Sequence, residues 1–445
     1  MNAPQGSPRR ALVSATLGFF IGFAAVALFG TTAARFQEVL RLSPLAVGFL
    51  VAMPALSGSL LRIPFAAWAD AAGARKPFGV LLLLSTVGMA GLSAVVVFLY
   101  PARLTPGLFP LILLLALLCG SAIATFSVGI SQVSYWFPQA RQGRALAVFA
   151  GVGNLAPGIF SFLLPFALVS FGLGGSYLAW LGMLLAGTAC YVALARNAPY
   201  FQFRAAGLDG RRARDEARGA GQELFPAASL RESLRVSARA WKTWALVTIY
   251  FTTFGGFIAL TAWLPTYWHG CYGLTAVGAG MLTGGYSVLT SVVRIAGGVL
   301  ADRLREGGEN TAILALFIML AGALVMVNAR EFELALPGVM LLAVGMGICN
   351  AAVFKIVPQA VPQAVGGAAG WVGGLGAFGG FAVPPMMAFA VKDLGPKGYS
   401  IGFIVFVFLS LLSLLMAWLL KYMADEPVAA RVPGSAMLSE GAARS

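Results

Sequence analysis

Apolar runs of membrane-spanning length recur along the whole chain, and short polar stretches separate them. A spanning helix needs roughly 20 mostly apolar residues, because every backbone polar group must be hydrogen-bonded inside the lipid. The pattern therefore predicts an all-α polytopic membrane protein. Its twelve transmembrane helices are expected near 11–33, 45–69, 78–99, 107–136, 145–170, 176–196, 242–267, 275–301, 311–328, 336–358, 366–391 and 399–420.

A long polar stretch divides this pattern into two sets of six helices. We expect an N-terminal half at 1–196, a cytoplasmic linker at 197–241, a C-terminal half at 242–424 and a flexible cytoplasmic tail at 425–445. Within the linker, residues 205–222 are rich in Arg, Gly and Ala, which predicts disorder. The following segment SLRESLRVSARAW is expected to be a solvated linker that only sets topology. A basic amphipathic helix on the inner leaflet is the alternative.

Composition narrows the class of protein. The chain is 59% hydrophobic and 10% charged, and its net charge of +14 comes from short loops rather than from a basic soluble domain. We therefore expect no nucleic-acid partner. The four cysteines form no disulfide pattern, and with a single histidine, His269, no metal-ligand cluster can be assembled. We predict no metal site, no cofactor and no enzymatic activity, since no nucleophile or base constellation is present.

The distribution of Lys and Arg predicts the orientation in the membrane. These residues are concentrated in the termini, the linker and every second loop, and they are sparse in the remaining loops. Cytoplasmic loops carry the excess of positive charge, so both termini are expected in the cytoplasm. The first apolar run is long and lacks a strong cleavage signal, so it is interpreted as an uncleaved helix rather than as a signal peptide.

Two arginines, Arg62 and Arg294, interrupt otherwise apolar runs. A charge near the bilayer centre costs about 2.5–3.5 kcal/mol on insertion scales, so it is rarely present without a role. Each arginine is followed eight residues later by an aspartate, Asp70 or Asp302, at the cytoplasmic end of its helix. All 16 acidic residues fall in loops, tails or helix ends, so no carboxylate inside the membrane can pair with either arginine. The two cations at matching depth therefore predict a clamp for a small anion.

Other motifs repeat between the halves and support a transporter. The helix ends YWFPQARQG (135–143) and VFKIVPQAVPQAVGG (353–367) each lead into a glycine-rich helix, FAGVGNLAPG (149–158) or WVGGLGAFGGFAVPP (371–385). Paired interrupted segments of this kind are typical of carriers whose site lies near mid-membrane at the repeat interface. Most of the glycines are expected only to pack helices. We assign Gly151, Gly153 and Asn154 to the site, because an amide inside an apolar span needs a polar partner.

The loop motifs FAAWADAAGARKP (65–77) and GGVLADRLREGG (297–308) resemble the two signature loops of the major facilitator superfamily. More narrowly, the chain resembles the nitrate/nitrite porter family through AVFAGVGN, IYFTTFGGF, GICNAAVFKIVPQ and GGAAGWVGGLGAFGGFAVP. It departs from the usual pattern at Ala66, where glycine is common, and at Pro157, where a small residue is common. We expect Pro157 to alter the bend of the fifth helix.

The resemblance implies a role for particular residues. Arg62 and Arg294 would donate charge-assisted hydrogen bonds to the anion, and the planar guanidinium suits a planar or bent oxyanion. Hydroxyl and amide donors would come from Tyr250 and Asn154, and the aromatic walls from Phe254 and Phe126. Without the resemblance, ordinary packing explains these aromatic residues equally well. The residues assigned to gating are Asp70, Asp302, Lys355 and Asn350; the two aspartates would accept hydrogen bonds from loop arginines or from a helix N-terminus in the other half.

The predicted function is alternating-access exchange of nitrate for nitrite by a monomer in an inner membrane. Proton-coupled carriers commonly use an acidic residue or a histidine inside the membrane, and here His269 is at the outer edge. Proton-coupled symport, with Lys355, Tyr250 or water carrying the proton, is the alternative. Transport of another small monovalent anion is less favoured. A membrane sensor would carry an added signalling domain, for which no segment is long enough.

Overall fold

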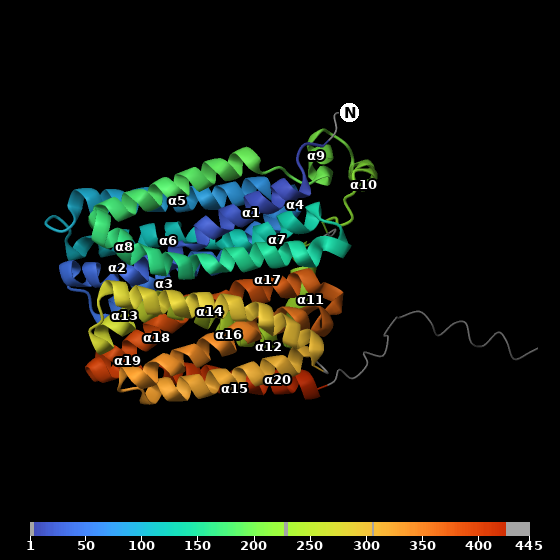
Figure 1. The fold of residues 1–445 in the computed structure, drawn as a ribbon. Coiled ribbons are helices and arrows are strands. Elements are labelled where there is room, and N and C mark those ends of the chain that lie inside the picture. The colour runs from blue at the N-terminus through green and yellow to red at the C-terminus, as the bar shows by residue number, and fades with distance from the viewer. Residues whose placement is uncertain (1–3, 227–229, 305–306, 424–445) are drawn as a thin grey trace, which may run out of the picture.

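The computed structural model describes residues 4–226, 230–304 and 307–423, and all secondary structure within these ranges is helical. The helices run roughly parallel, and the first half of the chain stacks on the second (Figure 1). The first half consists of α1 (Pro8–Phe23), α2 (Ala25–Leu40), α3 (Pro44–Leu60), α4 (Arg62–Ala72), α5 (Arg75–Leu99), η1 (Pro106–Leu108), α6 (Phe109–Gly120), η2 (Ser121–Ala124), α7 (Thr125–Trp136) and α8 (Gln139–Leu194).

The second half repeats this design. It consists of α12 (Trp241–Tyr250), η3 (Phe251–Gly255), α13 (Gly256–Tyr272), α14 (Ala276–Arg303), α15 (Gly307–Asn328), α16 (Phe332–Ala360), η4 (Pro362–Ala364), α17 (Val365–Leu375), η5 (Gly376–Phe378), α18 (Gly379–Leu394), η6 (Gly395–Lys397), α19 (Gly398–Ile401) and α20 (Ile404–Tyr422). Helix α3 packs against α18, and α8 packs against α14, so the second membrane helix of each half meets the fifth membrane helix of the other half across the interface.

The described residues contain eleven helical stretches that are long and apolar enough to cross a membrane. One of these stretches is long enough to cross it twice. That stretch, Arg144–Leu194, has 51 residues, which would extend about 75 Å as one straight helix across an apolar layer of about 30 Å. It is broken at Gly172, whose φ of 64° lies in the left-handed region that favours glycine. The described ranges thus provide twelve crossings, which confirms the predicted fold class.

Several helices are interrupted at mid-membrane, where the candidate site lies. The π-helical turn η3 separates α12 from α13, and the 3₁₀ turn η5 separates α17 from α18. Two glycines let these interrupted segments touch: a Cβ on Gly255 would lie 2.6 Å from the Cα of Gly379, and one on Gly379 would lie 2.3 Å from the carbonyl oxygen of Phe251. Irregular turns inside helices change the direction of side chains, and π turns are frequent at functional sites.

The first part of the linker is folded, so the prediction of disorder over 205–222 is wrong. Helices α9 (Pro199–Ala205) and α10 (Gly210–Gly219) enclose a small apolar core made by Phe203, Ala213 and Ala217 with Phe225 beside them. Asp209 caps α10, and the backbone N–H groups of Arg212 and Arg211 lower the pKa of its carboxyl group below the usual value. Packing of these few apolar residues folds the segment into helices despite its polar composition.

The second part of the linker, α11 (Leu230–Arg239), packs against α17 rather than remaining solvated as expected. The backbone N–H of Gly367 donates to Ser233 Oγ at 3.0 Å, and Trp371 Nε1 donates to the carbonyl oxygen of Leu234 at 3.0 Å. The linker helices lie at the same end of the helix bundle (Figure 1). The predicted flexible tail, 425–445, lies outside the described residues.

Candidate functional site

Arg62 is buried at the contact between the two halves. It is the first residue of α4, directly after the interruption at Leu61, and only 1% of its surface is exposed. Its Nε atom donates to the carbonyl oxygen of Gly58 at 3.1 Å, and Nη1 donates to the carbonyl oxygen of Gly373 at 2.8 Å. Its Nη2 atom is buried and has no hydrogen-bond partner among the described residues. A buried guanidinium nitrogen without a partner is unfavourable, so it favours a bound acceptor.

Arg294 reaches the same place from α14 in the second half. Both cations lie beside the ring of Phe254: the Cζ of Arg62 is 5.3 Å from its centroid, and the Cζ of Arg294 is 5.8 Å from it. The Cζ of Arg62 also lies 5.1 Å from the ring centroid of Phe126. Aromatic faces attract cations, so the rings hold both guanidinium groups without neutralising their charge. The structure therefore brings together the two arginines that the sequence analysis paired.

Tyr250 adds a buried hydroxyl group beside the arginines. Its ring stacks on Phe254 with centroids 4.8 Å apart and an interplanar angle of 9°. The hydroxyl lies close to Arg294 but does not reach hydrogen-bond geometry, and it has no hydrogen-bond partner in the described part of the chain. It can therefore donate to an anion held between the guanidinium groups.

A small cavity of about 10 Å³ adjoins Arg294, and Asn154 and Asn350 are among the residues around it. Such a volume is about the size of one water-sized probe, so the site is nearly closed. The Asn154 Nδ2 atom donates to the carbonyl oxygen of Ala150 at 2.7 Å. The Oδ1 atoms of both asparagines are buried and unpaired within the described ranges. A 180° rotation of either amide would present its NH₂ group instead, so each can serve an anion as donor.

Sequence reasoning missed three lining side chains, namely Phe257, Thr290 and Ser291. Ser291 Oγ donates to the carbonyl oxygen of Asn154 at 2.8 Å, which joins α14 to α8 across the two halves. Thr290 and Ser291 precede Arg294 by four and three residues, a spacing that places them on its face of the helix. That spacing was a usable signal, whereas nothing in the sequence pointed to the carbonyl oxygen of Gly373.

The two glycines assigned to the site occupy different environments. A Cβ on Gly153 would lie 2.0 Å from the ring of Phe19, and Phe19 contacts Phe126 with centroids 5.2 Å apart. Gly153 thus makes room for the aromatic wall. A Cβ on Gly151 would meet no described atom within 4 Å. The part of either glycine in anion binding stays a prediction.

The residues assigned to gating lie at different depths. Asp70 Oδ1 accepts a hydrogen bond from Tyr135 Oη at 2.6 Å, so its partner is α7 of its own half rather than the other half. Lys355 Nζ donates to the carbonyl oxygen of Ala301 at 2.5 Å, close to Asp302 in the last turn of α14. The side chain of Asp302 lies outside the described part of the structure. Asn350 lies at the cavity beside Arg294.

Comparisons with known proteins identify the family of the chain. The model of the Major Facilitator Superfamily matches residues 15–384. The "Probable nitrate/nitrite antiporter NarK1" of Thermus thermophilus is 31% identical over 400 residues, covering 86% of this chain and 85% of that protein. The "Probable nitrate/nitrite transporter NarK2" of Mycobacterium tuberculosis is 30% identical over 398 residues, covering 89% and 92%. The "Nitrite extrusion protein" of Bacillus subtilis is 26% identical over 409 residues, covering 91% and 92%.

Solved structures support the fold independently. The xylose transporter XylE from E. coli, in a partially occluded inward-open conformation, superposes with a TM-score of 0.69 at 14% identity, covering 94% of this chain and all of that one. The human organic anion transporter MFSD10 superposes with a TM-score of 0.62 at 17% identity, with the same coverage. At such low identity these likenesses concern the fold alone. Together with the family match and the relatives, they show that the chain belongs to the major facilitator superfamily and, within it, to the nitrate/nitrite transporters.

Proposed function

We propose that this multi-pass membrane protein exchanges nitrate for nitrite by alternating access. The observation that carries the proposal is the pair Arg62 and Arg294, one from each half, on the ring of Phe254. Neither arginine has a carboxylate partner among the described residues, and Arg62 keeps one unpaired nitrogen. The printed names of the relatives, which include nitrate/nitrite antiporters and transporters, support these two anions as substrates.

The chemistry of the site suits a small oxyanion. A guanidinium group presents parallel N–H donors that match two oxygens of one planar anion, and hydrogen bonds between charged partners are roughly twice as strong as neutral ones. Tyr250 Oη and the amides of Asn154 and Asn350 supply further polar groups at the perimeter. Because the cavity is about 10 Å³ and nitrate is larger than a water molecule, binding must move lining side chains apart.

Charge repulsion explains why exchange is the favoured mode. With no anion between them, two guanidinium groups repel each other, which opposes the closed conformation through which the carrier must pass. A bound anion offsets that repulsion, so the halves close and reorient only when loaded. A carrier that cannot return empty must bring one anion back for each one it moves.

Proton-coupled nitrate symport is the alternative mechanism. The groups considered for carrying the proton are Lys355, Tyr250 and water. Lys355 lies away from the arginine pair, with its Nζ at the carbonyl oxygen of Ala301. Carriage of another small monovalent anion, such as formate, would use the same arginines and is tested by competition.

The decisive experiment measures uptake of isotopically labelled nitrate into proteoliposomes. The vesicles are empty, loaded with nitrite, or placed under an inward proton gradient, and Arg294→Lys serves as the control variant. We expect uptake into nitrite-loaded vesicles alone, with the variant at background. Uptake into empty vesicles driven by the proton gradient would replace exchange by symport. Strong inhibition by formate, together with nitrite-independent uptake, would point to a different substrate.

We also propose an oligomeric state and a membrane location for the protein. The clamp is complete within one chain, because both arginines come from the same polypeptide, and we therefore propose a monomer. The halves at 1–196 and 242–424 would rock as bodies, joined by the linker at 197–241. The proposed location is the inner membrane, and the excess of Lys and Arg at the termini and in the linker supports an orientation with both termini cytoplasmic.

A further inference from the structure

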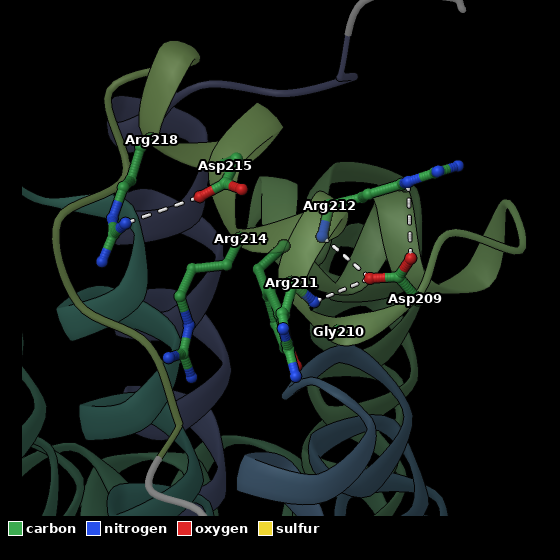
Figure 2. A pocket seen from close by; sticks show the side chains of 8 residues that line it. Asp209, Gly210, Arg211, Arg212, Arg214, Asp215 and Arg218 are labelled. Carbon is green, nitrogen blue, oxygen red and sulfur yellow. Dashed lines mark hydrogen bonds and ion pairs between the residues drawn. The ribbon is translucent and has the colours of Figure 1, made fainter.

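The folded part of the linker, α9 with α10, forms an open cavity of about 830 Å³ at the cytoplasmic end of the protein. Its lining is dominated by four arginines with two aspartates and Tyr200 (Figure 2). The arginines are Arg211, Arg212, Arg214 and Arg218, and the aspartates are Asp209 and Asp215. This site is separate from the arginine pair between the halves, and no step of the transport mechanism described above uses it.

The arginines are only partly neutralised. Arg212 lies 3.6 Å from Asp209, and Arg218 lies 3.5 Å from Asp215, and both pairs are largely exposed to solvent. Ion pairs of this kind contribute little. Arg211 and Arg214 have no carboxylate within 4 Å among the residues the structure describes. The lining therefore keeps an excess of positive charge that attracts anions.

Aromatic contacts and packing of α10 on α9 hold the arginines of the cavity in place. The Cζ atoms of Arg214 and Arg218 lie 5.4 Å and 5.6 Å from the ring centroid of Phe225, which holds two like charges beside one ring. Below them, Ala213 and Ala217 are fully buried against Phe203, so α10 is fixed to α9. The side chains of Arg211, Arg214 and Arg218 extend toward the same side of α10 (Figure 2). Gathering like charges is unfavourable unless an anion offsets their repulsion.

We propose that this cavity binds a phosphate-bearing anion with at least two negative charges. Arginine forks recognise phosphate oxygens in a bidentate manner, and a volume of several hundred Å³ is typical of a small-molecule site. A single nitrate ion would leave most of the arginines without a partner. The phosphate group belongs either to a soluble metabolite or to an anionic lipid headgroup of the inner leaflet, because basic clusters next to a membrane bind both.

The position of Arg214 connects the cavity to the predicted gate. Arg214 and Tyr200 also line a second cavity, of about 500 Å³, whose wall includes Asp70 and Arg204. An anion held by Arg214 therefore lies one side chain away from the cavity wall formed by Asp70. This inference concerns a second anion site, so it holds whichever ion is transported between the halves.

The test measures binding of pyrophosphate to the purified full-length protein by isothermal titration calorimetry at low salt. The double variant Arg211→Gln/Arg214→Gln removes the two arginines without carboxylate partners. The matched control Arg231→Gln/Arg235→Gln removes the same charge from exposed positions on α11. We expect wild type and control to bind one pyrophosphate, and the double variant to bind at least tenfold more weakly. The absence of binding to wild type, or an equal loss in both variants, would overturn the proposal.

Two further arms complete the experiment. Protein in nanodiscs of neutral lipid is compared with protein in nanodiscs containing phosphatidylglycerol. Unchanged pyrophosphate affinity identifies a soluble ligand, whereas competition by the anionic lipid identifies a headgroup; each of these results supports the site. The four arginines are exposed and lie outside the small core, so we expect unchanged thermal unfolding of the double variant. If that variant does not fold, Arg211→Lys/Arg214→Lys keeps the charge and is expected to weaken binding severalfold, since lysine lacks the bidentate fork; unchanged affinity would contradict the proposal.

Discussion

Arg62 Nη1 donates a hydrogen bond to the carbonyl oxygen of Gly373 at 2.8 Å, and this bond joins α4 of the first half to α17 of the second. The same guanidinium group lies beside the ring of Phe254, and its Nη2 has no hydrogen-bond partner among the described residues. One side chain therefore ties the halves together and offers a donor to the anion. Any movement of α17 relative to α4 changes the position of the anion clamp.

Substitution of Arg62 by lysine should separate charge from geometry. Arg62→Lys keeps the positive charge but cannot bond Gly373 and the anion through two nitrogens at once. A hydrogen bond to a charged group is worth about 1.5–3 kcal/mol, so we expect nitrate affinity to fall roughly tenfold to a hundredfold. Calorimetric titration of the purified variant with nitrate measures this. Wild-type affinity would show that charge alone binds the anion.

Substitution of Tyr250 by phenylalanine should move stability and binding in opposite directions. The Tyr250 hydroxyl is buried without a hydrogen-bond partner in the described residues, which is unfavourable in the unliganded protein. Tyr250→Phe should therefore leave the melting temperature unchanged or raise it, while nitrate affinity falls several-fold. Tyr286→Phe is the control, because the hydroxyl of Tyr286 already bonds Met346 Sδ at 3.0 Å. A drop in melting temperature with intact binding would refute this role of Tyr250.

Two glycines two positions apart provide a test of the aromatic wall. Gly153→Ala would place a methyl group 2.0 Å from the ring of Phe19, and overpacking of this kind typically costs about 1–3 kcal/mol. Gly151→Ala meets open space and should be neutral, or stabilising by less than about 1 kcal/mol, through higher helix propensity. The melting temperature and the nitrate exchange rate of both variants test this difference. Equal behaviour of the two would mean that Phe19 moves aside.

Loss of the Trp371 indole N–H should affect the rate of transport more than substrate affinity. Trp371 Nε1 donates a hydrogen bond to the carbonyl oxygen of Leu234 and so attaches α17 to the linker. Trp371 lies two residues before Gly373, whose carbonyl oxygen accepts the hydrogen bond from Arg62. Trp371→Phe keeps an aromatic ring but releases this anchor, which contributes about 0.5–1.5 kcal/mol. We expect an altered maximal exchange rate and an unchanged KM for nitrate. Trp418→Phe, on an exposed face of α20, is the matched control. A change confined to KM would place Trp371 at the anion instead.

The candidate site was partly readable from the sequence because burial of charge is expensive. Arg62 and Arg294 stood out as cations in apolar runs without acids, and the structure places both beside Phe254. The partners of these residues were less predictable. Tyr135 was not foreseen as the partner of Asp70, and a backbone oxygen such as that of Gly373 carries no sequence signal.

The structure of the linker could not be predicted from its amino-acid composition. Its Arg-, Gly- and Ala-rich composition predicted disorder over 205–222, yet Ala213 and Ala217 meet Phe203 in a buried cluster. Averaged composition does not register two alanines on one face of α10 that meet a phenylalanine of α9. The docking of α11 likewise depends on α17, which lies more than a hundred residues further along the chain.

The number of crossings, the division into two halves and the two cations of the clamp could all be predicted from the amino-acid sequence. Each of these follows from local hydropathy and from the cost of placing polar groups in lipid. The tertiary structure alone decided which polar atoms remain unpaired at the clamp, how tightly the site closes, and where the linker arginines gather. These depend on contacts between segments far apart in the chain, where helix interruptions and close backbone approaches set the direction of each side chain.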